Sequence, residues 1–297
     1  MDIKLVKRED IEKPRWNGCV HYAPNGNVFG YTWYLDAIAR EWDGLVENNY
    51  ESVMPLVYRN NWLNKKELHQ PSLIRELGIY SINMLSKQRI QAFLDAIPAE
   101  YKYWEMSLND RNSAVEKLAF TTTPQANYYL GLNRSYEEIS AEYSADLLRE
   151  LGKAEEVGYV ISGGFKPELL ADFYKKHTKH SNQSARDFHG VQRIMYNVLH
   201  RGLGFATGVL DTNGDLVAAD FYIYSHHKVV SFLPVVSPAG QENGAAALMY
   251  NTLIQGHAGR QITLDFNRTE GKLAQGFGAE ATYFYQLKRN ERLFGVI

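Results

Sequence analysis

The chain has 297 residues, which is enough for one large domain or two domains of ordinary size. Its formal net charge of -2 excludes the overall basic field of many nucleic-acid-binding proteins, so DNA is not expected as a partner. The only cysteine, Cys19, excludes an intramolecular disulfide and is typical of a reducing compartment.

The N-terminal segment, residues 1–16, is charged and lacks the apolar core of a signal peptide. No stretch of the sequence reaches the ~20 apolar residues that a transmembrane helix needs. We therefore expect a cytoplasmic protein that has no membrane partner.

Helical and strand-like patterns alternate through the first part of the chain. The predicted elements are a helix over residues 31–40, strands over 44–47 and 52–58, a helix over 86–97, and strands over 101–108 and 127–132. Ser86 is the predicted N-cap of the second helix, and Pro98 follows its end.

A long helix over residues 135–157 is predicted to join two halves of the chain, residues 1–134 and 135–297. Ser135 and Glu138 have the spacing of a capping box, and Gly158 follows as the predicted stop. Because no Pro/Ser-rich linker lies between the halves, we expect them to pack against each other.

The second half has a clearer order of elements. Strands are predicted over 159–162, 204–210, 216–224, 228–236, 262–266 and 281–288, and helices over 167–180, 187–201 and from about 245 onward. Asn213-Gly214 is a strong hairpin signal between two of these strands. The order predicts an α/β fold whose mixed sheet carries helices on its faces.

The most informative segment is residues 234–256, where a strand leads through a short loop into a helix. Gly240 and Gly244 allow the backbone to bend and to approach a ligand closely. The helix N-terminus presents backbone N–H groups and a positive dipole end, which suit a pyrophosphate. An ordinary strand-to-helix turn is the alternative. A Lys-containing phosphate loop is excluded, because Ala245 stands where its lysine would be.

This segment resembles the donor loop of the GNAT fold. Gln241-Glu242-Asn243-Gly244-Ala245-Ala246 matches the family pattern Gln/Arg-x-x-Gly-x-Gly/Ala at all three specified positions, and it follows a hairpin and a third strand as in that fold. The resemblance implies an acyl-CoA donor, with acetyl-CoA as the first candidate, held by these six residues.

A second resemblance is to the Fem-type aminoacyltransferases, which are tandem GNAT-like folds. Residues 132–138 resemble their L-x-x-S-x-E-E opening, and Lys153-Ala154 with Gly158 resemble the K-A-x-x-x-G ending of their junction helix. Leu264-Asp265-Phe266 and the run from Gly276 to Ala279 resemble their closing segment. The resemblance implies two GNAT-like halves, of which only the second has a recognisable donor loop.

The chain also departs from the Fem pattern. Leu273-Ala274-Gln275 replaces the Phe-Lys-Lys run of enzymes that build peptidoglycan bridges, and no long helical arm for tRNA is present. Together with the low net charge, these departures disfavour tRNA as a partner.

Amine acylation needs a group that accepts the proton of the amine and a group that protonates the leaving thiolate. Asp265, at the end of a predicted strand, is a candidate base or amine anchor, with a loop cap as the alternative. Tyr283 and Tyr285, on the last strand, are candidate acids, with packing as the alternative. Asp220, in the middle of a strand, is interpreted as a substrate anchor or an exposed edge residue.

His177 and His180 lie one helical turn apart, but no third metal ligand accompanies them, so we expect a solvated helix end and no metal.

The sequence therefore predicts an N-acyltransferase that moves an acyl group from acyl-CoA to a small-molecule or peptide amine by direct attack. One alternative is a Fem-type transferase that uses aminoacyl-tRNA and acts on a cell-wall precursor. Another is a GNAT-like protein that binds a ligand without catalysis. The acceptor and the oligomeric state stay open.

Overall fold

The computed structural model describes residues 1–118, 120–178, 185–267 and 270–290. The chain forms two compact units, one made of residues 1–125 with the segment from Tyr283 onward, and the other of residues 126–282. We call them unit 1 and unit 2. The sequence-based halves, 1–134 and 135–297, and their packing against each other stay predictions. The boundaries of the units fall within two strands, β7 (Thr121–Gly131) and β14 (Glu280–Asn290).

Unit 1 is a mixed sheet with helices. Its strands are β1 (Ile3–Val6), β2 (Glu41–Glu47), β3 (Ser52–Asn60), β4 (Lys66–His69), β5 (Tyr80–Ser81) and β6 (Tyr103–Leu108), and its α-helices are α1 (Lys13–Tyr22), α2 (Thr32–Ile38) and α3 (Lys87–Asp95). The 3₁₀ helices η1 (Arg8–Asp10), η2 (Val28–Gly30) and η3 (Asp110–Lys117) also belong to it. Antiparallel pairing joins β1, β2, β3 and β4 in that order, and β4 pairs in parallel with β6.

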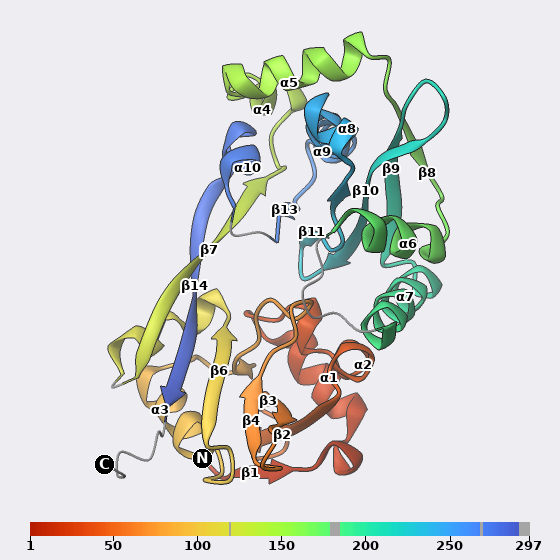
Figure 1. Cartoon of the computed structure of the whole chain (residues 1–297). Helices are drawn as coiled ribbons and strands as arrows, with labels where there is room; N and C mark the ends of the chain where they lie inside the picture. The colour runs from red at the N-terminus through yellow and green to blue at the C-terminus, as the bar shows by residue number, and fades with distance from the viewer. Residues whose placement is uncertain (119, 179–184, 268–269, 291–297) are drawn as a thin grey trace, which may run out of the picture. The chain divides into compact units, whose positions relative to one another are not determined.

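Unit 2 repeats this plan with different connections. Its helices are α4 (Tyr136–Ser140), α5 (Ala145–Glu156), α6 (Pro167–His177), α7 (Ala185–His200), α8 (Pro238–Glu242), α9 (Ala245–His257) and α10 (Lys272–Gly276). Its strands are β8 (Val160–Gly163), β9 (Gly204–Leu210), β10 (Leu216–Ser225), β11 (Lys228–Ser231), β12 (Val235–Val236) and β13 (Thr263–Asp265). The sheet order is β7-β13-β11-β10-β9-β8 (Figure 1). The pair β11 and β13 is parallel, and the other neighbouring pairs in this order are antiparallel.

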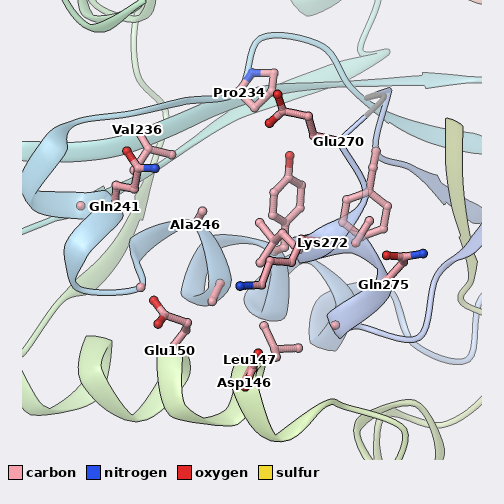
Figure 2. Close-up of a pocket in the computed structure, with 18 of the residues that line it drawn as sticks. Asp146, Leu147, Glu150, Pro234, Val236, Gln241, Ala246, Glu270, Lys272 and Gln275 are labelled. Carbon is pink, nitrogen blue, oxygen red and sulfur yellow. The ribbon is translucent and has the colours of Figure 1, made fainter. Parts of the chain in front are cut away.

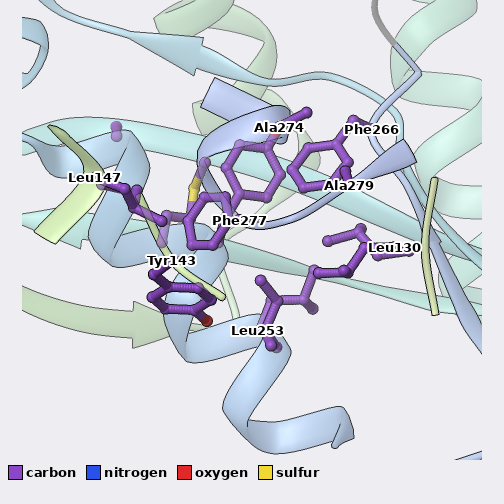
Figure 3. Packing of buried hydrophobic residues seen from close by; sticks show 14 of the residues in the cluster. Leu130, Tyr143, Leu147, Leu253, Phe266, Ala274, Phe277 and Ala279 are labelled. Carbon is purple, nitrogen blue, oxygen red and sulfur yellow. The ribbon is translucent and has the colours of Figure 1, made fainter. Parts of the chain in front are cut away.

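The core of unit 2 lies between the sheet and the helices α5, α9 and α10. Phe277 packs edge-on against Tyr143, with 5.2 Å between ring centroids, and Figure 3 shows Leu147 and Ala274 beside it. Phe277 therefore packs the Gly276–Ala279 segment into the core. Along β10, Tyr222 belongs to this cluster, whereas its neighbour Phe221 points to the opposite face and is also fully buried. Both faces of β10 are therefore covered.

Several predicted elements are confirmed, and others differ. The mixed α/β sheet, the Ser86 cap, the Ser135–Glu138 capping box and the Asn213-Gly214 hairpin are present. The long junction helix is wrong, because it breaks into α4 and α5, and Ser144 caps the second of them. Within the described residues no helix is long and apolar enough to cross a membrane.

Candidate functional site

A cavity of ≈ 780 Å³ lies within unit 2, beside the predicted donor loop. Residues of α5, α9 and α10 line it together with β12 and the end of α6. Figure 2 shows Gln241 and Val236 at one end, Glu270 beside Pro234 at another point of the wall, and Glu150 directed from α5 toward the start of α9. The cavity thus joins segments that lie up to about 130 residues apart in the sequence, from Ser144 to Gly276.

Three residues of the predicted donor loop line the cavity, namely Gln241, Gly244 and Ala246. They are the three positions that the GNAT pattern specifies. Glu242 and Asn243 are not among the lining residues, and Ala245 is fully buried. The segment is more ordered than the predicted loop, since residues 238–242 form α8, which Ser237 caps by accepting the Gly240 N–H.

The two glycines of this segment are needed for packing within the protein. Gly244 has a φ of 72°, and a Cβ atom there would lie 2.0 Å from the carbonyl oxygen of Glu150 in α5. A Cβ atom on Gly240 would lie 2.4 Å from the carbonyl oxygen of Val217. The sequence analysis predicted that these glycines let the backbone approach a ligand closely. In the structure, the groups close to them are the backbone atoms of Glu150 and Val217.

The start of α9 has free hydrogen-bonding capacity. Gly244 is its N-cap and offers no side chain, and no described group accepts a hydrogen bond from the N–H groups of Ala245, Ala246 or Ala247. Lys272 lines the same cavity. A helix N-terminus and a lysine are both attractive to anions, so this end of the cavity suits a phosphate-containing ligand.

The acidic groups of α5 that line the cavity are neutralised. Glu150 pairs with Lys153 at 2.8 Å, and Asp146 pairs with Arg149. Two further charged residues of the cavity wall, Lys272 and Glu270, have no ion-pair partner among the described residues. The cavity therefore has a positive region at the start of α9 and a negative group beside Pro234 (Figure 2).

The strand β12 presents a backbone edge without a strand partner to the cavity. Val235 pairs with Ala219 of β10, and Ser237 donates its N–H to Val217. Because neighbouring residues of a strand direct their N–H and C=O groups to opposite sides, Val236 directs these groups away from β10. The parallel neighbour of β11 ends at Asp265, so within the described residues no strand covers this edge.

A buried carboxylate fixes the interruption between β11 and β12. The pairing with β10 shifts by one residue between these strands, which indicates a β-bulge over residues 232–234. Asp220 is fully buried and accepts hydrogen bonds from the N–H groups of Phe221 at 2.7 Å and Leu233 at 2.9 Å, and from the Ser231 hydroxyl. The predicted edge position of Asp220 is wrong, because it lies in the core and holds the bulge.

Asp265 lies next to the cavity-lining residue Phe266 but is not itself among the lining residues. It is 5% exposed and accepts hydrogen bonds from Asn127 and from the N–H of Asn267, both at 2.8 Å. The second bond is a loop cap, which the sequence offered as the alternative. Lys228 lies 3.9 Å away.

Tyr283 and Tyr285 belong to unit 1. The side chain of Tyr283 is 54% exposed, and Tyr285 packs against the hydrophobic core of that unit. The structure does not bring these two tyrosines together with the donor loop inside one unit. Their roles stay predictions.

His177, the last residue of α6, lines the cavity, which the sequence interpretation of a solvated helix end missed. Its spacing carried a signal, since Leu170, Phe173 and His177 follow one another at helical spacing on a face whose first two members are buried. His180 lies outside the described residues. Among the described residues no three His, Cys, Asp or Glu side chains gather into a metal site.

Comparison with solved structures gives similar folds at low sequence identity. FemX has a TM-score of 0.62 at 10% identity, over 96% of this chain and 97% of that chain. L-PGS from Bacillus licheniformis has a TM-score of 0.56 at 10% identity, with 97% and 94% covered. A tandem GNAT protein from the clavulanic acid biosynthesis pathway has a TM-score of 0.52 at 12% identity, with 97% and 98% covered. A scan of family models and a search of curated proteins found no match.

Proposed function

We propose, from the premise that the chain has the tandem GNAT fold of Fem-like proteins, that it is an N-acyltransferase. The cavity of unit 2 holds an acyl-CoA, with acetyl-CoA as the first donor to test, and the acyl group moves to an amine. The acceptor is a small molecule or a peptide, the protein acts in the cytoplasm, and no metal takes part.

The start of α9 supports the position of the donor pyrophosphate. The N–H groups of Ala245, Ala246 and Ala247 have no acceptor among the described residues and can donate to phosphate oxygens. Gln241 and Lys272 line the same cavity and can add a neutral and a charged hydrogen bond.

The edge of β12 supports the position of the pantetheine arm. This arm carries amide groups, and the N–H and C=O groups that Val236 directs away from β10 can pair with them as one strand pairs with another. An arm that starts at α9 and follows β12 toward its first residue brings the acyl group to the bulge beside Pro234.

The proposed reaction is direct attack of the amine nitrogen on the thioester carbonyl carbon. A C–N bond forms, the C–S bond breaks, and the sulfur leaves as a thiolate that takes up a proton. Most of the acceleration comes from holding two reactants side by side in a preformed cavity. In this proposal Asp265 is the candidate anchor of the acceptor ammonium, while the roles of Tyr283 and Tyr285 as acids stay predictions.

The observation that carries the proposal is a single cavity that joins the open edge of β12 to the uncapped start of α9. Isothermal titration calorimetry with acetyl-CoA tests it directly. The variant Ala246→Glu places a carboxylate at the proposed pyrophosphate site, and we expect it to weaken acetyl-CoA binding by at least about tenfold, which is about 1.4 kcal/mol.

The fold should tolerate this substitution, because an acidic side chain in the first helical turn interacts favourably with the helix dipole. Gln255→Glu is the matched control, since it adds the same charge to an exposed position near the other end of α9 and should leave binding unchanged. Equal binding by wild type and Ala246→Glu would refute the proposed donor position.

The two alternatives predict other results in the same titration. A transferase that uses aminoacyl-tRNA would bind no acetyl-CoA and would bind tRNA with strong salt dependence. A protein that binds a ligand without catalysis would bind acetyl-CoA but transfer nothing to any amine. The formal net charge of -2 supports the first proposal over tRNA, since tRNA binding relies on many phosphate contacts from basic residues.

A further inference from the structure

His177 lines the cavity that would hold the proposed donor. It is the last residue of α6, which packs against β12, and it lines the cavity together with Thr178 and Pro234. Pro234 belongs to the bulge between β11 and β12, the part of the strand farthest from the start of α9. A cavity-lining side chain on a helix that packs against β12 is a candidate to act on the thioester and the attacking amine.

The imidazole of His177 is held by an apolar contact. Its ring packs on that of Phe173, with 4.6 Å between the ring centroids, and Phe173 is 8% exposed. In the part of the chain that the structure describes, neither ring nitrogen of His177 has a hydrogen-bond partner. The ring is therefore fixed in position while both nitrogens stay available to a ligand.

The surroundings of His177 favour its neutral form. Partial burial lowers the pKa of His177 below its ordinary value of 6.5, and the charge of Lys176 lowers that pKa further. The same helix carries Lys175 and the acidic residues Glu168 and Asp172. Among the elements packed against it, β12 carries no charged residue, β10 carries the buried Asp220, and α7 carries His189 and Arg193. The cavity wall contributes Glu270 and Lys272. At neutral pH the imidazole can accept a proton.

We propose that His177 is the general base that takes the proton of the acceptor amine. This inference rests on the proposed acyltransferase function. The ring nitrogen removes one proton from the ammonium form, and the free amine then attacks the thioester. The C–N bond forms, the C–S bond breaks, the second proton of the nitrogen passes to the thiolate, and the imidazolium returns its proton to water.

Asp265 is less suited to this step. Two donors, Asn127 and the N–H of Asn267, already occupy one of its oxygens, and these bonds stabilise the charged carboxylate rather than its protonated form. Asp265 also lies outside the cavity lining. The anchoring role proposed above needs no proton transfer and is compatible with His177 as the base.

A first experiment follows the imidazole signals by NMR in the full-length protein, with the His177 signal assigned through its loss in His177→Gln. Addition of acetyl-CoA should shift the His177 signal and its titration, while His200, the exposed last residue of α7, should not respond. A His177 signal that is indifferent to acetyl-CoA bound by the same sample would overturn the inference.

A second experiment measures thiol release from acetyl-CoA with n-butylamine or hydroxylamine as the acceptor. His177→Gln should slow the reaction with n-butylamine about 100-fold and remove the acidic limb of its pH profile. The loss should be smaller with hydroxylamine, which is mainly unprotonated at neutral pH. His200→Gln, the matched control, should behave as the wild type does.

Calorimetry separates the two levels of the proposal. His177→Gln should bind acetyl-CoA as the wild type does, because His177 is not among the groups proposed to hold the pyrophosphate or the pantetheine arm. Wild-type protein that binds no acetyl-CoA would refute the proposed function, and the role of His177 with it. Binding and turnover that are the same in wild type and His177→Gln would refute only the role of His177.

Discussion

The two units contain the same succession of strands and a helix, but the described space next to these elements differs between them. In unit 1, β4 pairs in parallel with β6, and the short strand β5 returns to pair with β3 before α3. In unit 2, β11 pairs in parallel with β13, and β12 returns to pair with β10 before α9. The cavity beside the short strand of unit 2 is ≈ 780 Å³, whereas the space in unit 1 that β3, β4, β6 and the connection before β5 line is ≈ 10 Å³, about the minimum for one water.

The difference comes from the connection between the two strands. Residues 232–234 suffice to join β11 to β12, whereas residues 70–79 join β4 to β5. Within this longer connection Leu77 donates its N–H to Ser107 and accepts from the N–H of Asn109, both at 2.8 Å. The chain itself therefore pairs with the end of β6 and fills the opening that a ligand could use.

The N-cap of the helix that follows the short strand also differs between the units. The Ser86 side chain caps α3 by accepting the Arg89 N–H, whereas the cap of α9 is Gly244, which has no side chain. Arg89 turns to Glu47 of its own unit, at 3.1 Å. A shared order of strands thus does not make a binding site. We propose that the length of the connection before the short strand and the residue at the helix N-cap determine whether a donor site forms, and that unit 1 has none.

The largest effect is expected at the glycine cap of unit 2. Gly244→Ala should destabilise the protein by about 3 kcal/mol or more, because the new Cβ meets the Glu150 backbone and φ is positive there. Chemical denaturation would measure it. Gly256→Ala, in the same helix with open space around its Cβ, should stabilise by up to about 1 kcal/mol. Equal effects of the two substitutions would contradict the close packing of α5 on α9.

The next effect concerns the filled opening of unit 1. Leu77→Ala should cost about 3 kcal/mol, since Leu77 is 3% exposed and leaves a cavity. Leu63→Ala, at a position that is 51% exposed, should change stability by less than about 0.5 kcal/mol. Leu77→Ala should still bind one acetyl-CoA per chain, because α3 keeps its cap. A second bound acetyl-CoA would mean that the connection alone closes a latent site.

The smallest effect is expected at the serine cap of unit 1. Ser86→Ala should cost about 1 kcal/mol. The reactivity of Cys19 can report this loss of stability, because its thiol is buried in unit 1. Burial raises the pKa of Cys19 to about 12, so the thiol stays unreactive while the unit is folded.

Labelling of Cys19 by a thiol reagent should then become about fivefold faster in Ser86→Ala, in proportion to the larger open population. Ser113→Ala, at an exposed position of the same unit, should label as the wild type does. Unchanged labelling in Ser86→Ala would show that the cap does not stabilise unit 1.

Local patterns predicted local structure well. The start of α9 at Ala245, the capping box at Ser135 and the stop at Gly158 depend on neighbouring residues, and the structure confirms them. The break between α4 and α5 was missed, although Ser144 is a good cap, because the apolar pattern continues across it. Local signals of this kind give elements and their ends, but they do not tell which elements meet.

The candidate site depended on tertiary structure. The motif at Gln241, Gly244 and Ala246 was readable because its three positions are close in sequence. His177 was not, because the end of α6 meets β12 only when both pack on the sheet. Asp220 was misread for the same reason, since a strand pattern alone does not reveal that a carboxylate receives two backbone N–H groups and a hydroxyl.

By itself, the sequence indicated most of the strands and helices and the place of the predicted donor loop, since both follow from backbone preferences over a few residues. The tertiary structure decided that this segment borders a cavity, that its glycine serves packing, and that a histidine lines the same cavity. Those outcomes depend on how far a connection reaches and on which distant groups it brings into contact, and no local pattern encodes either.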